Sequence, residues 1–173
     1  MRKQAKKPPV ISGVSVIEQP RKNGSLDPTD LKKKIRKTGH GGKSGVYVYG
    51  LRDSTGRHPV WVGHARKQSF EAECCSDHVM SKVREALLQN RGTPVLYLLP
   101  QGRPGQGKTD MRAIMALEKR VIGMAHAANP RRILNKYGLP SKPNAQTDES
   151  LPVGRGRLSK AGASLRKMLK RRK

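Results

Sequence analysis

Gly45-Val46-Tyr47-Val48-Tyr49 and Val60-Trp61-Val62-Gly63 are the two stretches that decide the fold. Both are rich in β-branched and aromatic residues, which favour strands, and Asp53-Ser54-Thr55-Gly56 between them is typical of a turn. The pattern therefore predicts an antiparallel hairpin. Alternation along the first strand places its two tyrosines on one face and its valines on the other. In a basic chain, tyrosine hydroxyls on a small sheet suggest a surface that handles phosphate.

Other apolar segments extend this hairpin into an α+β domain. Residues 93–99 form a nearly continuous apolar run and are predicted to be a third strand, while residues 10–17 suit either a short strand or a segment lying on the core. Capping residues and helical spacing predict helices at about 28–38, 77–91 and 110–128. We therefore expect a small three-stranded antiparallel sheet flanked by helices, with basic extended N- and C-terminal arms.

The charge of the chain points to a polyanionic partner. Its 173 residues contain 37 Lys and Arg against 12 Asp and Glu, a formal net charge of +25. Nucleic acid is the commonest partner of so basic a protein, so we expect DNA, and RNA is not excluded. Residues 1–43 are expected to form a basic arm with a short helix, 44–140 the compact domain, and 141–173 a linker and basic tail.

The basic end segments predict contact with the phosphate backbone, without reading of the base sequence. The tail is expected to be disordered and to become helical on a polyanion. A membrane surface is a second partner for a basic amphipathic helix, but the apolar face of this one is thin. The cations expected to bind DNA are Lys32, Lys33, Lys34, Arg36, Lys37, Arg103, Lys108, Arg166, Lys167, Lys170, Arg171, Arg172 and Lys173.

Neither the cysteines nor the apolar runs suggest secretion or membrane insertion. The only two cysteines, Cys74 and Cys75, are adjacent and cannot alone supply a four-ligand zinc site or a disulfide framework. No apolar run is long enough to span a membrane, and the N-terminus lacks the apolar region of a secretory signal. We therefore expect a soluble cytoplasmic protein with no membrane partner.

Glu118 occupies a position in the long helix where an acidic residue is unexpected. At roughly 100° per residue, Ile114 and Ile122 lie about 40° to either side of it, so Glu118 falls in the middle of the apolar face. Burying an unpaired carboxylate costs several kcal/mol, so such a group pairs or binds a cation. Two interpretations are open: an ion pair with an internal arginine, or a ligand for Mg²⁺, which often uses only one or two protein carboxylates.

The order of these residues resembles the GIY-YIG nuclease family. Gly45-Val46-Tyr47 and Trp61-Val62-Gly63 are similar to the two halves of its signature, and the similarity covers roughly residues 44–138. Each short motif alone is weak, and the ordered set carries the resemblance. The residues that follow in the family's order are Arg66, Lys67, His78, Glu118 and Asn135.

The resemblance implies a metal-dependent endonuclease that hydrolyses DNA phosphodiester bonds. Tyr47 would contact or deprotonate the attacking water, with a neighbouring His or Tyr sharing that role. Arg66 or Lys67 would stabilise charge on the scissile phosphate. Glu118 would hold one Mg²⁺ or Mn²⁺. Asn135 would buttress the site or contact the backbone.

Two features depart from the family pattern. Trp61 stands where a tyrosine is usual, so Tyr49 or His64 would have to replace the lost hydroxyl. The family commonly places an arginine on the helix after the sheet, yet no arginine occurs between residues 67 and 82. His78 lies at the start of that helix, where a surface or capping role competes with the catalytic role that the resemblance implies.

A second function class stays open beside the nuclease. A non-catalytic nucleic-acid-binding protein, either ribosomal-like, nucleoid-type or with a degenerate nuclease fold, would carry the same charge and would not need Glu118. The two classes differ in whether the chain cleaves DNA. A nuclease with one active site per chain would cut both strands as a homodimer or by sequential nicks.

Overall fold

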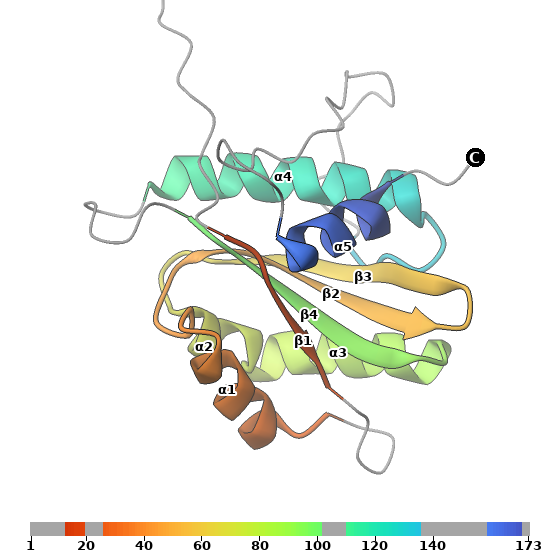
Figure 1. Ribbon diagram of the computed structural model, residues 1–173, viewed down its shortest axis with the longest axis horizontal. Helices are drawn as coiled ribbons and strands as arrows, with labels where there is room; N and C mark the ends of the chain where they lie inside the picture. The colour runs from red at the N-terminus through yellow and green to blue at the C-terminus, as the bar shows by residue number, and fades with distance from the viewer. Residues whose placement is uncertain (1–12, 20–25, 102–109, 136–158, 171–173) are drawn as a thin grey trace, which may run out of the picture.

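The computed structural model describes residues 13–19, 26–101, 110–135 and 159–170 of the chain. Within them, four strands and five helices form an α+β fold (Figure 1). The strands are β1 (Ser15–Glu18), β2 (Gly45–Asp53), β3 (Gly56–Ala65) and β4 (Thr93–Pro100). The helices are α1 (Pro28–Lys37), α2 (Phe70–Cys74), α3 (Asp77–Gln89), α4 (Met111–Ala128) and α5 (Lys160–Leu169).

The sheet has four strands in the order β1-β4-β2-β3, and each neighbouring pair is antiparallel. The hairpin and the strand at 93–100 are confirmed, but the expectation of three strands was wrong by one. The additional strand is β1, which pairs beside β4 with Ile17 opposite Leu96. β1 is only four residues long, as is common for an edge strand. From sequence alone, so short an apolar run cannot be distinguished from a segment that lies on the core without pairing.

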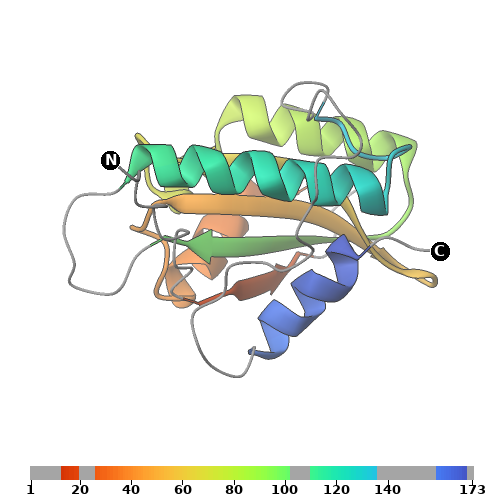
Figure 2. The ribbon, with the colours of Figure 1, turned by 90° about the horizontal axis from the view of Figure 1, so that it is seen from above.

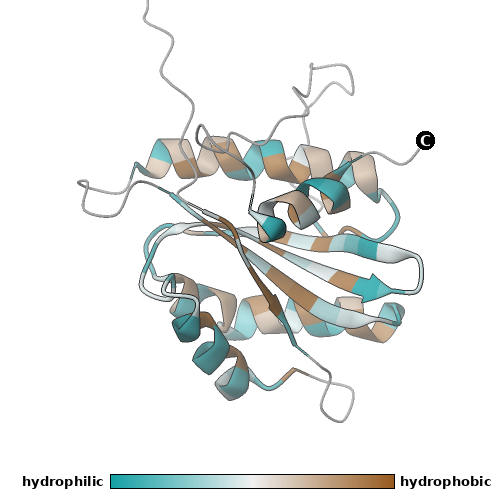
Figure 3. Ribbon diagram, in the orientation of Figure 1, coloured by the Kyte–Doolittle hydropathy of each residue, from teal (hydrophilic) through white to brown (hydrophobic). Residues whose placement is uncertain are grey.

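Helices cover both faces of the sheet, and the alternation along β2 decides which side chains meet which helices. Tyr47 and Tyr49 belong to a buried cluster with residues of α1, α2 and α3, whereas Val46 and Val48 belong to one with residues of α4 and α5. Figure 2 shows α4 and α5 on one side of the strands. Figure 3 shows the strands as the most apolar part of the ribbon. The predicted division of tyrosines from valines is confirmed.

Helix caps follow the sequence signals closely. Asp27 caps α1 and accepts hydrogen bonds from the backbone N–H of Thr29 and Asp30, with Pro28 at the first helical position. Ser76 caps α3 in the same way. Asp110 caps α4, in place of the neighbouring Thr109 that the sequence suggested and that lies outside the described residues. A carboxylate cap also complements the positive end of the helix dipole.

The C-terminal helix is part of the folded core, which corrects the expectation of a disordered tail. α5 buries Leu165, Met168 and Leu169 in the cluster that also contains residues of α4 and β2. Gly50 makes room for this contact, because a Cβ atom there would collide with the sulfur of Met168. The Ser164 hydroxyl is bound by Tyr97 and by Arg57, which joins α5 to the sheet.

Asp53 at the end of the hairpin should make stability depend on acid pH. Burial alone would raise its pKa, but hydrogen bonds from Thr55 and Arg132 and the charge of His58 outweigh burial and hold the pKa well below its ordinary value. A carboxyl with a lowered folded-state pKa stabilises the fold above the unfolded-state pKa of about 3.9, and that stabilisation is lost as the pH falls towards the folded-state value.

The Asp53→Asn substitution tests this effect. We expect it to lower the free energy of unfolding by about 1–2 kcal/mol at pH 7, and we expect the difference from the wild type to shrink as the pH falls below 4. Urea denaturation at pH 7, 5 and 3 measures it. A difference that stays constant across this range would refute the role of the Asp53 charge.

Candidate active site at the edge of strand β3

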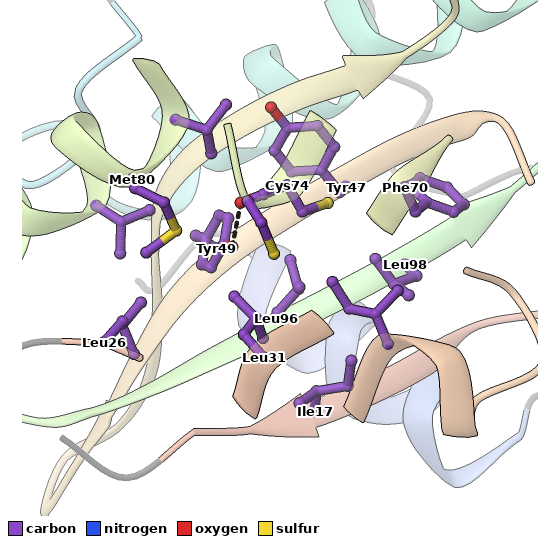
Figure 4. Close-up of a cluster of buried hydrophobic side chains, with 14 of the residues drawn as sticks. Ile17, Leu26, Leu31, Tyr47, Tyr49, Phe70, Cys74, Met80, Leu96 and Leu98 are labelled. Atoms are coloured by element: carbon purple, nitrogen blue, oxygen red, sulfur yellow. Dashed lines mark hydrogen bonds between the residues drawn. The ribbon is translucent and has the colours of Figure 1, made fainter. Parts of the chain in front are cut away.

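Tyr47 lies across Gly63 and brings its hydroxyl to the edge strand. The two residues are directly opposite each other in the β2–β3 ladder, and the Tyr47 side chain is only 1% exposed. A Cβ atom added to Gly63 would collide with the phenol oxygen. Figure 4 shows the Tyr47 hydroxyl pointing towards β3. The second half of the signature therefore needs glycine at this position to accommodate the tyrosine of the first half.

Gly63→Ala should destabilise the protein by about 1–3 kcal/mol, because the new methyl group has no space and must displace the Tyr47 ring. Thermal or urea denaturation measures the loss. Gly42→Ala is the matched control, since a Cβ atom at Gly42 meets nothing within 4 Å and the backbone there is not left-handed. Equal stabilities of the two variants would contradict the close packing of Tyr47 on Gly63.

The Tyr47 hydroxyl is a hydrogen-bond donor and a poor base. Burial raises its pKa well above the ordinary tyrosine value, Cys74 raises it further, and a hydrogen-bonding interaction with Trp61 lowers it only in part. The phenol therefore stays protonated at neutral pH. Of the two roles that the resemblance implied, a protonated phenol does not suit deprotonation of the water, and contact with the water needs more exposure than the 1% of Tyr47.

Glu118 pairs with His64 on the opposite side of the sheet from the Tyr47 ring. The carboxylate Oε2 lies 2.7 Å from Nδ1 of His64, a close contact in which Nδ1 makes no well-aligned hydrogen bond, and the Glu118 side chain is 18% exposed. The partner is thus a histidine and not the internal arginine that the sequence left open.

Glu118 lies inside the apolar face of α4, with the buried Ile114 and Ile122 on either side of it. It is nearer one edge of that face, since Met115 beyond Ile122 is 38% exposed. This partial exposure arises because α4 packs over β3, an edge strand, which leaves the outer side of the helix uncovered. This position lets the carboxylate reach solvent.

Arg66 follows β3 and lies beside the same helix. Its guanidinium Nη1 is 3.1 Å from the sulfur of Met115, which is a weak acceptor, so its other donors remain available. Among the described residues, Arg66 forms no ion pair with a carboxylate. Lys67 is exposed. Of the two candidates for the phosphate, Arg66 is therefore the one held near Glu118.

Trp61 and His78 form a second pair on the tyrosine-bearing side of β3. Their rings meet edge to face with centroids 6.1 Å apart, and His78 is exposed at the start of α3. The buried indole N–H faces the Tyr47 hydroxyl closely enough to lower the tyrosine pKa, although the geometry falls short of a well-aligned hydrogen bond. Tyr49 cannot replace the tyrosine that Trp61 displaces, because its hydroxyl donates to the Cys74 carbonyl at 2.9 Å (Figure 4).

Asn135 buttresses the edge of β3. Its side-chain Oδ1 accepts a hydrogen bond from the Val62 N–H at 2.7 Å, and its Nδ2 donates to the Val62 carbonyl at 2.8 Å. Leu134 N–H donates to the Val60 carbonyl, and Asn129 to the Pro59 carbonyl. The segment after α4 thus satisfies backbone groups of an edge strand that would otherwise be unpaired. The geometry gives Asn135 a positioning role.

Asn135→Ala should lower the free energy of unfolding by about 1–3 kcal/mol, because both buried backbone groups of Val62 lose their partner. Asn129→Ala removes a single 3.2 Å hydrogen bond from a half-buried position and should cost less than about 1 kcal/mol. Urea denaturation of both variants measures the difference. A cost for Asn135→Ala no larger than that for Asn129→Ala would contradict the buttress.

The expected DNA-binding cations divide into four groups. Lys32, Lys33, Arg36 and Lys37 on α1 are exposed, although Arg36 pairs with Glu71. Lys34 is half-buried, forms an ion pair with Asp30 and donates a hydrogen bond to Gln19. Those that are exposed on or beside α5 are Arg166, Lys167 and Lys170, and those outside the described residues are Arg103, Lys108, Arg171, Arg172 and Lys173.

Sequence reasoning missed three exposed cations on the α4 and α5 side of the molecule. Arg112 and Lys119 on α4 and Lys160 on α5 are exposed, and among these two helices Glu118 is the only acidic residue. The helical wheel that placed Glu118 also turned Arg112 and Lys119 away from the core. The helical spacing alone therefore predicts a basic surface beside the Glu118 carboxylate.

The described side chains fit a metal ion only if the ion also binds substrate. No group of three or more His, Cys, Asp or Glu side chains that could hold a metal occurs within the described ranges. A single partly exposed carboxylate suffices for Mg²⁺ that keeps water and a substrate phosphate in its shell. Glu118 has this exposure, and its Oε2 is shared with His64.

Comparisons with known proteins add no relative. No protein family, curated protein or solved structure matches the chain. None of the described helices combines the length and apolar character needed to cross a membrane.

Proposed function

We propose that this protein is a divalent-metal-dependent DNA endonuclease that hydrolyses phosphodiester bonds, with a GIY-YIG-like site at the edge of β3. One observation carries the proposal: Glu118, a partly exposed carboxylate, meets His64, the residue after Gly63, on the edge strand β3. The carboxylate and the imidazole come from α4 and β3 and meet on one face of the sheet, while Tyr47 packs against Gly63 from the other face. The carboxylate and the imidazole together suit hydrolysis of a phosphate ester.

The chain's own residues divide the work of the reaction. Tyr47 is buried against Gly63, so its part in this proposal is to support the edge strand that carries His64. His78 is exposed beside Trp61 on the opposite face of the sheet from Glu118, so a metal held by Glu118 would itself lower the pKa of the attacking water. The planar guanidinium of Arg66 can donate two parallel hydrogen bonds to the phosphate. The ammonium group of a lysine such as Lys67 would bind the phosphate less directionally.

Glu118 is the residue that would hold Mg²⁺ or Mn²⁺. When bound, the metal polarises the scissile phosphate and stabilises the leaving oxygen. His64 positions the carboxylate through the 2.7 Å contact, which limits the rotation of the Glu118 side chain. The exposed outer side of α4 leaves this carboxylate open to a substrate phosphate.

The substrate duplex lies on the α4 and α5 side of the sheet. Exposed cations there flank a site with one carboxylate, so the phosphate backbone is attracted to the surface that carries Glu118. Lysine and arginine contacts to phosphates do not read bases, so we expect cleavage with little sequence preference and binding that weakens with salt.

A non-catalytic nucleic-acid-binding protein is the second candidate, and one observation favours it. His64 lies 2.7 Å from Glu118, so the carboxylate has a polar neighbour without a metal. In that case the β3 edge serves stability, and the exposed cations alone account for binding.

An end-labelled duplex separates the two functions. Incubation of the purified protein with the duplex in Mg²⁺ or Mn²⁺, at several salt concentrations, should give shorter products that are absent with chelator. Binding measured in chelator should persist. Binding without any metal-dependent product would leave the non-catalytic candidate as the function.

A further inference from the structure

α1 and α5 lie on opposite faces of the sheet (Figure 1). α1 packs Leu31 and Ile35 into the cluster that contains the tyrosines of β2. α5 packs Leu165 and Met168 into the cluster that contains the valines of β2. The outer surfaces of α1 and α5 therefore face in opposite directions.

α1 carries cations over the whole side that faces away from the sheet. At roughly 100° per residue, its exposed basic side chains fall within an arc of about 140°, opposite the two buried residues. Figure 3 shows this helix as hydrophilic away from the strands. Arg36 is engaged by Glu71, but the remaining three form no ion pair with any residue that the structure describes. These three, the α1 stripe, are Lys32, Lys33 and Lys37.

α5 carries a second stripe of the same kind. Its exposed cations fall within an arc of about 120° opposite Leu165, and the helix contains no acidic residue. Across the described part of the chain, none of these cations is paired with a carboxylate. The members of this α5 stripe are Lys160, Arg166, Lys167 and Lys170.

A single duplex cannot follow both stripes. The sheet and a helical layer on each of its faces lie between them, and the stripes point away from each other (Figures 1 and 2). Duplex DNA is stiff over about 150 base pairs, so bending one short duplex around the molecule is costly. Two separate strips of lysine and arginine on a rigid fold instead offer two places for phosphate backbones.

We propose that the protein binds two nucleic-acid duplexes at once, one on the α5 stripe and one on the α1 stripe, and thereby bridges them. The duplex on α5 also lies beside α4 and leads to Glu118, whereas the duplex on α1 lies behind the sheet. Both are recognised by phosphate charge, without contacts to bases. Bridging needs no cleavage and is independent of the proposed enzymatic activity.

A bead assay with the full chain in chelator tests the proposal. A biotinylated DNA duplex on beads should retain a free fluorescent duplex only when the protein is present. Three variants carry the same change in charge. The α1 variant combines Lys32→Gln, Lys33→Gln and Lys37→Gln; the α5 variant combines Arg166→Gln, Lys167→Gln and Lys170→Gln; the control combines Arg84→Gln, Arg91→Gln and Arg131→Gln, which are exposed arginines elsewhere.

We expect the α1 and α5 variants each to lose at least about fivefold of the captured duplex, and the control to keep it. Binding of a single duplex should weaken less than about threefold in either variant, because the other stripe remains. Its salt dependence should also stay close to that of the wild type. A fluorescent RNA duplex in the second position distinguishes the two sources of phosphate, and capture of either nucleic acid that is lost in the α1 variant supports bridging.

Three outcomes would overturn the proposal. Undiminished capture by the α1 variant would mean that bridging arises elsewhere, for example in a dimer. Equal loss in the control would mean that capture follows total charge. A fall of about 2.7 in the salt slope of single-duplex binding, the amount expected for three lost phosphate contacts, would mean that the α1 stripe belongs to one continuous footprint.

Discussion

Glu118→Gln should reduce metal-dependent cleavage by at least about 100-fold while leaving DNA binding intact or slightly tighter. Glutamine keeps the shape of the side chain but removes the charge that would hold the cation, and metal stabilisation of the transition state is worth several kcal/mol. Loss of one negative charge from a surface that attracts DNA does not weaken binding. Initial cleavage rates and binding isotherms, measured on the same preparations, check both expectations.

Glu85→Gln is the control for this substitution. It makes the same change in charge on α3, where Glu85 pairs with Lys82, away from the β3 edge, and should cleave at the wild-type rate. His64→Ala removes the partner of Glu118 and should lower the cleavage rate less than Glu118→Gln, because His64 only positions the carboxylate. Cleavage at the wild-type rate by Glu118→Gln would mean that the Glu118–His64 contact is structural and that Glu118 holds no catalytic metal.

Leu165→Ala should destabilise the protein by about 2–5 kcal/mol. Leu165 is fully buried in the cluster under α4 and α5, so removing its side chain leaves a cavity in the core. A tail that folded only on DNA would show no such cost. Urea denaturation in the absence of nucleic acid measures the change in the free energy of unfolding.

Leu88→Ala provides the matched comparison, since Leu88 on α3 is 84% exposed and its loss should change stability by no more than about 0.5 kcal/mol. The same leucine-to-alanine substitution is thus tested at a buried and at an exposed position. Equal midpoints for the two variants would mean that α5 does not belong to the core.

The hairpin could be predicted from sequence because local rules decide it. Period-two alternation, β-branched residues and a turn between two runs agree, and the observed register pairs Tyr47 with Gly63. The packing of α5 could not be predicted in the same way. Its apolar spacing was visible, but the high charge of the tail favoured disorder, and the space provided by Gly50 appears only when the sheet is assembled.

The candidate site was predictable in its members and not in its arrangement. Helical geometry singled out Glu118, but the partner His64 lies far away in sequence and meets it only because α4 crosses the edge strand. The same geometry placed Glu118 inside the apolar face. Its partial exposure could not be predicted, because it depends on the packing of α4 over an edge strand, which leaves the outer side of the helix uncovered.

Tyr47 shows why burial must be known before a role is assigned. The signature suggested either contact with water or its deprotonation, and sequence alone could not separate them. Packing across Gly63 removes the phenol from solvent and raises its pKa, which leaves support of the edge strand as its role.

Nicking of supercoiled plasmid by the purified wild type and Glu118→Gln, in parallel with Mg²⁺, Mn²⁺ or chelator, tests the central claim most directly. The proposal predicts that only the wild type with metal converts supercoiled to open-circular DNA, while both proteins bind the plasmid in chelator. Absence of nicking by the wild type with either metal, or equal nicking by both proteins, would contradict an active site built on Glu118.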